Sequence, residues 1–185
     1  MFYARTGESI AQFKGKRGFV VEEAPQFGLR GLWLNMRRKP LDSLKVRQAI
    51  AHAIDKGAIV NVLAGTGLLA DNPLPPGFLG HTENITRYSH DPSKAKRLLA
   101  EAGFPNGFKT SLLYASIAGY REVVPILQAQ LADAGIQVEL QPREAGTARA
   151  MMEQGNYDVV FQGLGRPPDH DILLSHGFHT SNYPP

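Results

Sequence analysis

The alternation of apolar and polar residues between positions 91 and 162 switches repeatedly between a helical and an extended period. Apolar side chains recur at helical spacing after Asp91 and Pro92, which supply a capping oxygen and a preformed first turn. Gly103 fits the left-handed conformation that commonly ends a helix. The pattern further predicts strands at 108–115, 136–140 and 157–162, and helices at 122–134 and 147–154. This β-α-β-α-β order is typical of parallel strands joined by right-handed crossovers, and therefore of an α/β fold.

Another strand is predicted before this unit. In the sequence LWLN at residues 32–35, the two leucines lie on one strand face, and Trp33 and Asn35 lie on the other. A tryptophan on a ligand-facing surface offers a rigid plate for stacking, whereas a tryptophan on a covered face packs in the core. The strand pattern leaves both roles open for Trp33.

Two helices follow this strand. The first is expected to have Asp42 or Ser43 as its cap, because their side-chain oxygens can accept bonds from the unpaired amides of a first turn. Residues 58–63 are predicted to form the second helix, which is short. The remaining segments are a predicted short strand at 19–23 and a loop rich in glycine and proline at 65–91. In the later helix at 122–134, the proline at position 125 is expected to lie in the first turn.

Composition narrows the range of functions. The 185 residues, 43% of them apolar, fit one domain or one domain with an appendage. The net charge of +3 comes from scattered basic residues offset by 17 acidic ones, which argues against nucleic acid as a partner. The absence of cysteine excludes a disulfide framework, thiol catalysis and cysteine-ligated zinc. No apolar run is long enough to span a membrane.

Sequence motifs of catalysis and cofactor binding are poorly represented. The chain contains no GxSxG elbow, no HExxH motif and no phosphate-binding GxxxxGK[ST] loop. Gly65-Thr66-Gly67 and Gly163-Leu164-Gly165 are short Gly-x-Gly stretches that do not complete a dinucleotide fingerprint. We therefore predict no enzymatic activity and no cofactor.

Arg166 follows the last predicted strand directly. In open α/β sheets, ligands bind in the crevice beyond the carboxyl ends of the parallel strands. An arginine at that position offers five donors in a fixed fork that suits a carboxylate or a phosphate. The alternative is a solvated loop arginine, or an ion pair with Asp169.

The C-terminal stretch holds three of the six histidines of the chain, namely His170, His176 and His179. Asp169 and Asp171 flank the first of them, and imidazole and carboxylate groups are ligands for zinc or nickel. The histidine spacing does not place two ligands on one helix face, so a capped helix start with a polar tail is the competing interpretation.

Several motifs occur in a fixed order along the chain. LWLN at 32–35 is followed by VRQAIAHAID at 46–55. Further along come NPLPPG at 72–77, DPSKAKRLLAEAG at 91–103 and QAQLADAGIQVEL at 128–140. Together they resemble the extracellular solute-binding proteins of peptide/nickel-type ABC importers, family 5, over essentially the whole chain.

The resemblance implies a lobe of the type II periplasmic-binding-protein fold, with a mostly parallel central sheet flanked by helices. Members of the family enclose their ligand between two lobes that close like a hinge. Residues 1–28 are then expected to be a remnant of the first lobe with the hinge strand. Residues 29–185 are expected to be the second, ligand-binding lobe, truncated at its C-terminal end.

The function implied by the resemblance is the substrate-binding component of an ABC importer. It would capture a peptide or another small solute and deliver it to the permease subunits in the membrane. The location implied is periplasmic or extracellular, although this fragment carries no export signal. Association with the membrane is expected only through the permease or through the missing N-terminal part.

The candidate ligand-binding residues on this interpretation are Trp33, Asn35, Arg166, Asp169 and His170. Peptide-binding members often carry an aspartate after the final strand, where it pairs with the amino terminus of the peptide. Arg166 stands at or near that position, so we expect a ligand with an acidic group in place of a peptide held by its amine. Two alternatives remain: a metal-dependent hydrolase or metal-chelate binder that uses the C-terminal histidines, and a regulatory module that senses a ligand without a transporter.

Overall fold

The computed structural model describes residues 11–21, 28–63, 67–72, 74 and 80–165. Its central feature is a four-stranded sheet with the order β1-β4-β2-β3. Strand β2 is parallel to β3 and β4, and β1 is antiparallel to β4, which confirms the mostly parallel sheet. The strands are β1 (Gly28–Leu34), β2 (Phe108–Ala115), β3 (Ile136–Arg143) and β4 (Val159–Gly165).

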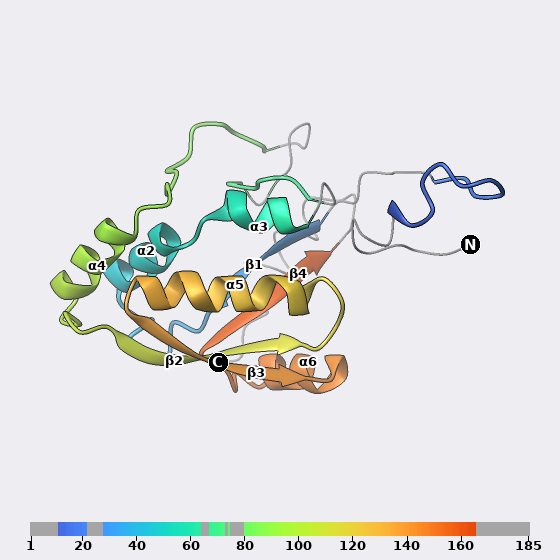
Figure 1. The fold of residues 1–185 in the computed structure, drawn as a ribbon. Helices are drawn as coiled ribbons and strands as arrows, with labels where there is room; N and C mark the ends of the chain where they lie inside the picture. The colour runs from blue at the N-terminus through green and yellow to red at the C-terminus, as the bar shows by residue number, and fades with distance from the viewer. Residues whose placement is uncertain (1–10, 22–27, 64–66, 73, 75–79, 166–185) are drawn as a thin grey trace.

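Helices cover both faces of the sheet (Figure 1). α5 connects β2 to β3, and α6 connects β3 to β4 in the opposite direction across the sheet. Right-handed crossovers that run in opposite directions place their helices on opposite faces. α2 packs against α4 and α5 on the α5 face. The helices are α2 (Leu44–Ala53), α3 (Lys56–Val62), α4 (Pro92–Glu101), α5 (Tyr120–Asp133) and α6 (Ala145–Glu153).

The central strands are buried on both faces, as expected for a parallel sheet. In β2, Leu112 belongs to the large cluster beneath α2, α4 and α5, and its neighbour Leu113 belongs to the smaller cluster beneath α6. In β4, Val159 and Phe161 face the first cluster, and Val160 faces the second. The two-residue period of each strand therefore divides its side chains between two cores.

Local signals in the sequence set the limits of α4. Asp91 is its N-cap, and the Asp91 carboxylate accepts a hydrogen bond of 2.8 Å from the amide of Lys94. Pro92 occupies the first turn, where its missing amide hydrogen leaves no bond unmade. Gly103 adopts a φ of 92°, which confirms it as the left-handed stop.

α5 begins earlier than the apolar pattern indicated. Its N-cap is Gly119, with a φ of 84°, and the Glu122 carboxylate accepts a hydrogen bond from the Gly119 amide. Pro125 is consequently the sixth residue of the helix, so the expectation that it lies in the first turn was wrong. The helix continues past Pro125 because this residue is exposed and removes a single intrahelical bond.

The start of α2 also differs in detail from the prediction. Ser43 occupies the N-cap position, but its side chain makes no capping bond. Arg47 instead donates to the carbonyl oxygens of Leu41, at 3.0 Å, and Asp42, at 2.8 Å. The arginine therefore ties the helix to the turn that precedes it. α3 is capped by Asp55, whose carboxylate accepts a hydrogen bond of 3.1 Å from the amide of Ala58.

The described N-terminal residues, 11–21, contribute no side chain to either core cluster. Residues 14–18 form turns, and residues 19–21 are not in a strand, which corrects the described part of the strand expected at 19–23. Phe13 and Phe19 pack against each other with ring centroids 4.9 Å apart. Within the described residues, both core clusters begin at or after position 32.

Candidate functional site

One edge of the sheet gathers the carboxyl ends of the three parallel strands, β2, β3 and β4. The first residues of β1 lie beside them, because antiparallel pairing places Gly28 opposite Gly165. We call residues 28–30, 116–121, 143–145 and 163–165 the carboxyl edge. The helices α5 and α6 both begin here, as βα connections require. This is the edge of an open α/β sheet where ligands bind.

Tyr120 organises the carboxyl edge. The ladder between β2 and β4 ends at the pair Tyr114–Phe161, because β2 turns away after Ala115. Beyond that point the Tyr120 hydroxyl oxygen accepts a hydrogen bond of 2.7 Å from the amide of Gly163. The Tyr120 ring also packs edge-on against Phe161, with centroids 4.8 Å apart. The Tyr120 hydroxyl thus accepts the hydrogen bond that a neighbouring strand would otherwise accept from β4.

Arg30 lies beside this tyrosine. Arg30 pairs with Gly163 in the register of β1 and β4, and Arg30 is exposed to solvent. Its guanidinium carbon lies 5.6 Å from the centroid of the Tyr120 ring. A cation over an aromatic face at this distance is attracted by the ring quadrupole. Arg30 is therefore held at the edge by a contact that leaves its hydrogen-bond donors available.

Two further arginines on the carboxyl edge are bonded to their own loops. Arg121 donates from Nε to the Ser116 hydroxyl at 3.1 Å and from the guanidinium to the Ser116 carbonyl at 3.0 Å. Arg143 donates to the carbonyl of Pro142 at 2.8 Å. These contacts shape the turns after β2 and β3.

Glu144 at the same edge caps α6. Its carboxylate accepts hydrogen bonds from the amides of Gly146, at 2.8 Å, and Thr147, at 3.2 Å. These bonds favour the charged form, so they lower the pKa of Glu144 below its ordinary value. Glu122 is likewise bonded at the start of α5, so these two glutamates serve their own helices.

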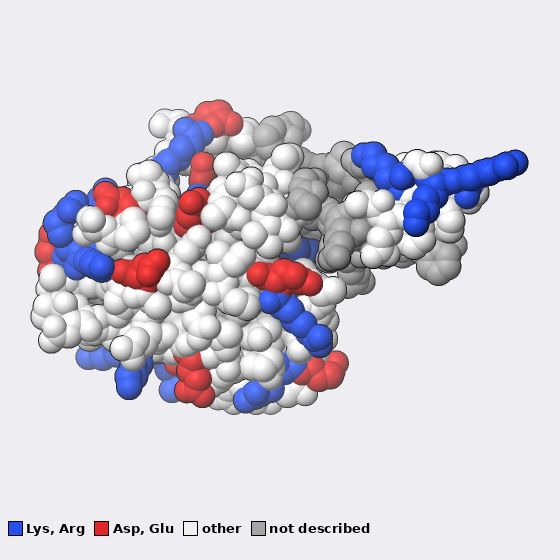
Figure 2. Space-filling model, in the orientation of Figure 1, with Lys and Arg blue, Asp and Glu red and all other residues white. Residues whose placement is uncertain are grey.

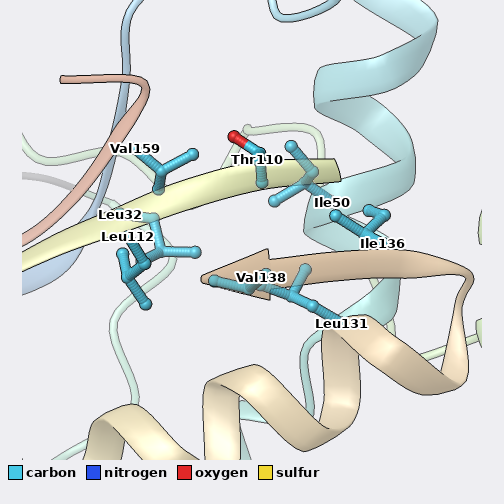
Figure 3. A pocket seen from close by; sticks show the side chains of 8 residues that line it. All are labelled: Leu32, Ile50, Thr110, Leu112, Leu131, Ile136, Val138 and Val159. Atoms are coloured by element: carbon cyan, nitrogen blue, oxygen red, sulfur yellow. The ribbon is translucent and has the colours of Figure 1, made fainter. Parts of the chain in front are cut away.

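The enclosed cavity of the sheet is not a ligand site. Figure 3 shows that the side chains lining it lie between the sheet and the helices α2 and α5. Its volume is about 10 Å³, about that of the smallest space that holds one water, and its lining is almost entirely apolar. The lining residues are Leu32, Ile50, Thr110, Leu112, Leu131, Ile136, Val138 and Val159. It is a packing gap in the core.

Comparison with known sequences identifies the family of the chain. Residues 1–185 match the family described as bacterial extracellular solute-binding proteins, family 5 Middle. The chain belongs to this family. It is 36% identical over 155 residues to the heme-binding protein A of Haemophilus influenzae, an alignment that covers 80% of the chain and 28% of that protein.

Solved structures of family 5 proteins share the fold. The ABC transporter-associated periplasmic binding protein DppA from Helicobacter pylori, in complex with the peptide STSA, has a TM-score of 0.81 at 33% identity, over 90% of this chain and 33% of its own. MoaA from A. tumefaciens R10, in complex with mannopinic acid, has a TM-score of 0.85 at 27% identity, over 96% of this chain and 36% of its own. The fold is therefore that of a type II periplasmic binding protein, and the similar proteins are binding proteins. The chain spans about a third of the length of the relatives it matches.

The two described residues that were expected to bind ligand, Trp33 and Asn35, lie away from the carboxyl edge. Trp33 is half-buried on the α6 face, where it packs against the cluster that includes Val160. Asn35 donates to the carbonyls of Gly155, at 3.1 Å, and Tyr157, at 2.9 Å. Both residues lie toward the edge opposite the carboxyl edge, so the geometry favours packing for Trp33 and an internal hydrogen-bonding role for Asn35.

The other expected ligand residues, Arg166, Asp169 and His170, lie outside the described residues, as do the remaining C-terminal histidines. Within the stretches that the structure describes, no group of three His, Asp or Glu side chains is placed to hold a metal ion. In the same stretches, no helix is both long and apolar enough to cross a bilayer.

Sequence reasoning missed Arg30 and Tyr120 in this family 5 chain. Arg30 shares a strand face with Leu32 and Leu34, so the alternation alone marked the position as one that should be apolar. Gly163 was noticed only as part of a Gly-x-Gly stretch. An arginine at an apolar position of a strand end was the available signal for the site.

Proposed function

We propose that this chain is part of the substrate-binding component of an ABC importer, which captures a peptide or another small solute between two lobes and delivers it to the membrane permease. The match of residues 1–185 to family 5 carries this proposal. The fold supports it, because the open α/β sheet leaves its carboxyl edge free of a covering helix in the described residues. The chain would act as a binding protein and not as an enzyme.

In this proposal residues 1–28 belong to the first lobe and the hinge strand, and residues 29–185 to the second lobe. Two observations support the division. Residues 11–21 share no side chain with either core cluster, and the sheet begins only at Gly28. Figure 1 draws this N-terminal segment apart from the sheet and its helices.

Ligand binding in such a protein selects a closed state, because contacts from both lobes are made only when the cleft shuts. The second lobe alone would supply part of those contacts. We therefore expect the isolated chain to bind solutes far more weakly than the full-length protein does. Isothermal titration of both forms with one solute measures the difference, and an isolated chain that binds at micromolar or tighter Kd would contradict the two-lobe mechanism.

Arg166, Asp169 and His170 remain proposed ligand residues on the segment that follows β4. An arginine at this position attracts an acidic group and repels an ammonium group. The ligand proposed is accordingly a solute with an acidic group directed toward Arg166. Calorimetry on the full-length protein tests this point: tight binding of unmodified di- to pentapeptides that Arg166→Ala leaves unchanged would contradict it.

The proposed location is periplasmic or extracellular, with the permease subunits as the protein partner. The described surface in Figure 2 carries both signs of charge interspersed over the sheet and helices. On the face shown, the sheet and helices carry no concentrated basic footprint of the kind found on a nucleic-acid-binding domain. Fractionation of cells that express the tagged full-length protein would test the location, and recovery in the cytoplasmic fraction alone would contradict it.

A further inference from the structure

We propose that Arg30, Tyr120 and Gly163 form a subsite that binds a carboxylate group of the ligand at the carboxyl edge. We call it the Arg30–Tyr120 subsite. The inference rests on the proposed function and deepens it, because it names described residues that select the chemical class of the solute. The ligand would present one planar carboxylate to two donors, a guanidinium and a phenolic hydroxyl.

The guanidinium of Arg30 is available to a ligand. Within the described part of the chain no carboxylate forms an ion pair with it, whereas Arg121 and Arg143 donate to carbonyl groups of their own loops. Its position over the Tyr120 ring limits the rotamers that it explores. A donor group that is already held in place loses less conformational entropy on binding, and the planar fork of arginine matches a carboxylate.

The hydroxyl of Tyr120 supplies the second donor. Its oxygen is occupied as an acceptor by the Gly163 amide at 2.7 Å. No described residue accepts the hydrogen of the hydroxyl. Chains of hydrogen bonds polarise one another, so a phenol that accepts from an amide becomes a better donor. The geometry thus fixes the direction of this hydroxyl, with its oxygen toward β4 and its hydrogen free for a ligand.

Gly163 keeps the space between the two donors open. A Cβ atom on this residue would lie 3.1 Å from the Tyr120 hydroxyl oxygen and 3.6 Å from Cγ of Arg30. The backbone of Gly163 is not in the left-handed region, so its conformation does not require glycine. The reason for glycine at this point is therefore room beside the two side chains.

The charges around the subsite favour an anion. Three arginines belong to the carboxyl edge, and the glutamates at the starts of α5 and α6, Glu122 and Glu144, are bonded to the amides that begin these helices. Their carboxylates consequently neutralise helix ends, and among the described residues no other carboxylate is paired with Arg30. Closure of a cleft over this edge would exclude water and strengthen the attraction between Arg30 and a bound carboxylate.

Two sources of this carboxylate are chemically plausible, the C-terminus of a short peptide and the acid group of a sugar–amino acid conjugate. The experiment uses one probe for each source and a blocked form of each. The peptide pair is Met–Leu and Met–Leu amide. The conjugate pair is mannopinic acid and its fully amidated derivative. Calorimetry on the full-length protein gives the Kd of each probe and identifies the source.

In the wild type we expect at least one acid to bind about 10- to 100-fold tighter than its blocked form, which is the range for a hydrogen bond to a charged group. Arg30→Gln should remove this preference by weakening the acid and leaving the blocked form within about threefold. Arg30→Lys should restore part of the preference, because it returns the charge without the planar fork. Arg143→Gln is the matched control on the same edge and should keep the preference.

Failure of this inference and failure of the proposed function give different results. If the acids bind but Arg30→Gln keeps the preference for acid over blocked form, the Arg30–Tyr120 subsite is wrong and the transport role stands. If the blocked forms bind the wild type as tightly as the acids do, the Arg30–Tyr120 subsite is likewise wrong and the transport role stands. If the wild type binds none of the four probes, the subsite is contradicted, and the proposed function, which covers other solutes, stands. A melting temperature of Arg30→Gln equal to that of the wild type establishes that the variant folds.

Discussion

The two edges of the central sheet use polar side chains in opposite ways. At the edge opposite the carboxyl edge, which we call the amino edge (residues 34–38, 108–111 and 154–158), the side chains of Asn35 and Asp158 are committed to internal bonds. At the carboxyl edge, Arg30 and the Tyr120 hydroxyl keep donors that no described residue uses. The comparison teaches that a polar residue with unused bonding capacity is a better candidate for ligand binding than one that the fold has already satisfied.

Asn35→Ala should have the largest effect on stability. The change removes two donors to the carbonyls of Gly155 and Tyr157 and the acceptor for the Arg37 amide at 3.1 Å. Leaving half-buried polar groups unpaired costs about 1–3 kcal/mol each, so we expect a loss of about 3 kcal/mol in the free energy of unfolding. Urea denaturation of the full-length protein measures it. Asn35→Asp keeps the acceptor but sets a carboxylate oxygen against the two carbonyl oxygens, so it should lose at least as much.

A change below about 0.5 kcal/mol for Asn35→Ala would contradict the comparison, because the internal hydrogen bonds of Asn35 would then contribute little to stability. A large loss of ligand affinity at unchanged stability would also contradict the comparison, because Asn35 would then act on the ligand and not on the fold. That result would return Asn35 to the ligand site.

Asp158→Ala should have the next largest effect. One oxygen of its carboxylate accepts from both the amide of Ser111, at 3.1 Å, and the hydroxyl of Ser111, at 2.7 Å. We expect a loss of about 2 kcal/mol, because hydrogen bonds to a charged acceptor are stronger than neutral ones. Ser111→Ala removes only the hydroxyl and should lose about half as much. Equal losses for the two variants would show that the amide bond contributes little.

Tyr120→Phe sharpens the comparison at the other edge. It keeps the aromatic ring beneath Arg30 and the contact with Phe161 but removes the partner of the Gly163 amide. We expect a stability loss of about 1 kcal/mol, together with an affinity loss for a carboxylate ligand of about tenfold. Thermal melting and calorimetry on the same preparation separate the two. A loss of stability without a loss of affinity would make Tyr120 purely structural.

The smallest effect should appear with pH. The amides of Gly146 and Thr147 lower the pKa of Glu144 from its ordinary value of 4.5. A carboxyl group with a lowered folded-state pKa contributes stability above the unfolded value of the pKa, and this contribution disappears as pH falls through the folded value. Glu144→Gln should therefore lower stability slightly at pH 7, where the charged carboxylate caps α6, and the two proteins should converge in stability as pH falls below about 4.5. Parallel acid titrations of the two proteins would test this, and identical curves would contradict it.

Much of the fold was predictable because its signals are local. Asp91, Pro92 and Gly103 each act within one helical turn of their own position, so sequence alone identified both ends of α4. The parallel direction of β2, β3 and β4 followed from the alternation of helical and extended periods along the chain. The early start of α5 was missed because the capping residue is a glycine, whose left-handed conformation the apolar pattern does not report.

The site was less predictable because its contacts join distant segments. Tyr120 and Gly163 are 43 positions apart, and Asn35 is 120 positions from Gly155. Alternation correctly put Trp33 opposite the neighbouring leucines, but a strand pattern does not say which helix will cover each face. The ligand roles of Arg166, Asp169 and His170 stay predictions.

The most direct test of the account sets one variant from each edge side by side in the full-length protein. Arg30→Gln and Asn35→Ala are each measured by calorimetry with Met–Leu and mannopinic acid, and by urea denaturation. We predict that Arg30→Gln weakens the bound acid by about tenfold or more at unchanged stability, and that Asn35→Ala lowers stability at nearly unchanged Kd. An Arg30→Gln variant that loses stability and keeps its affinity, with an Asn35→Ala variant that does the reverse, would contradict the assignment of ligand recognition to the carboxyl edge.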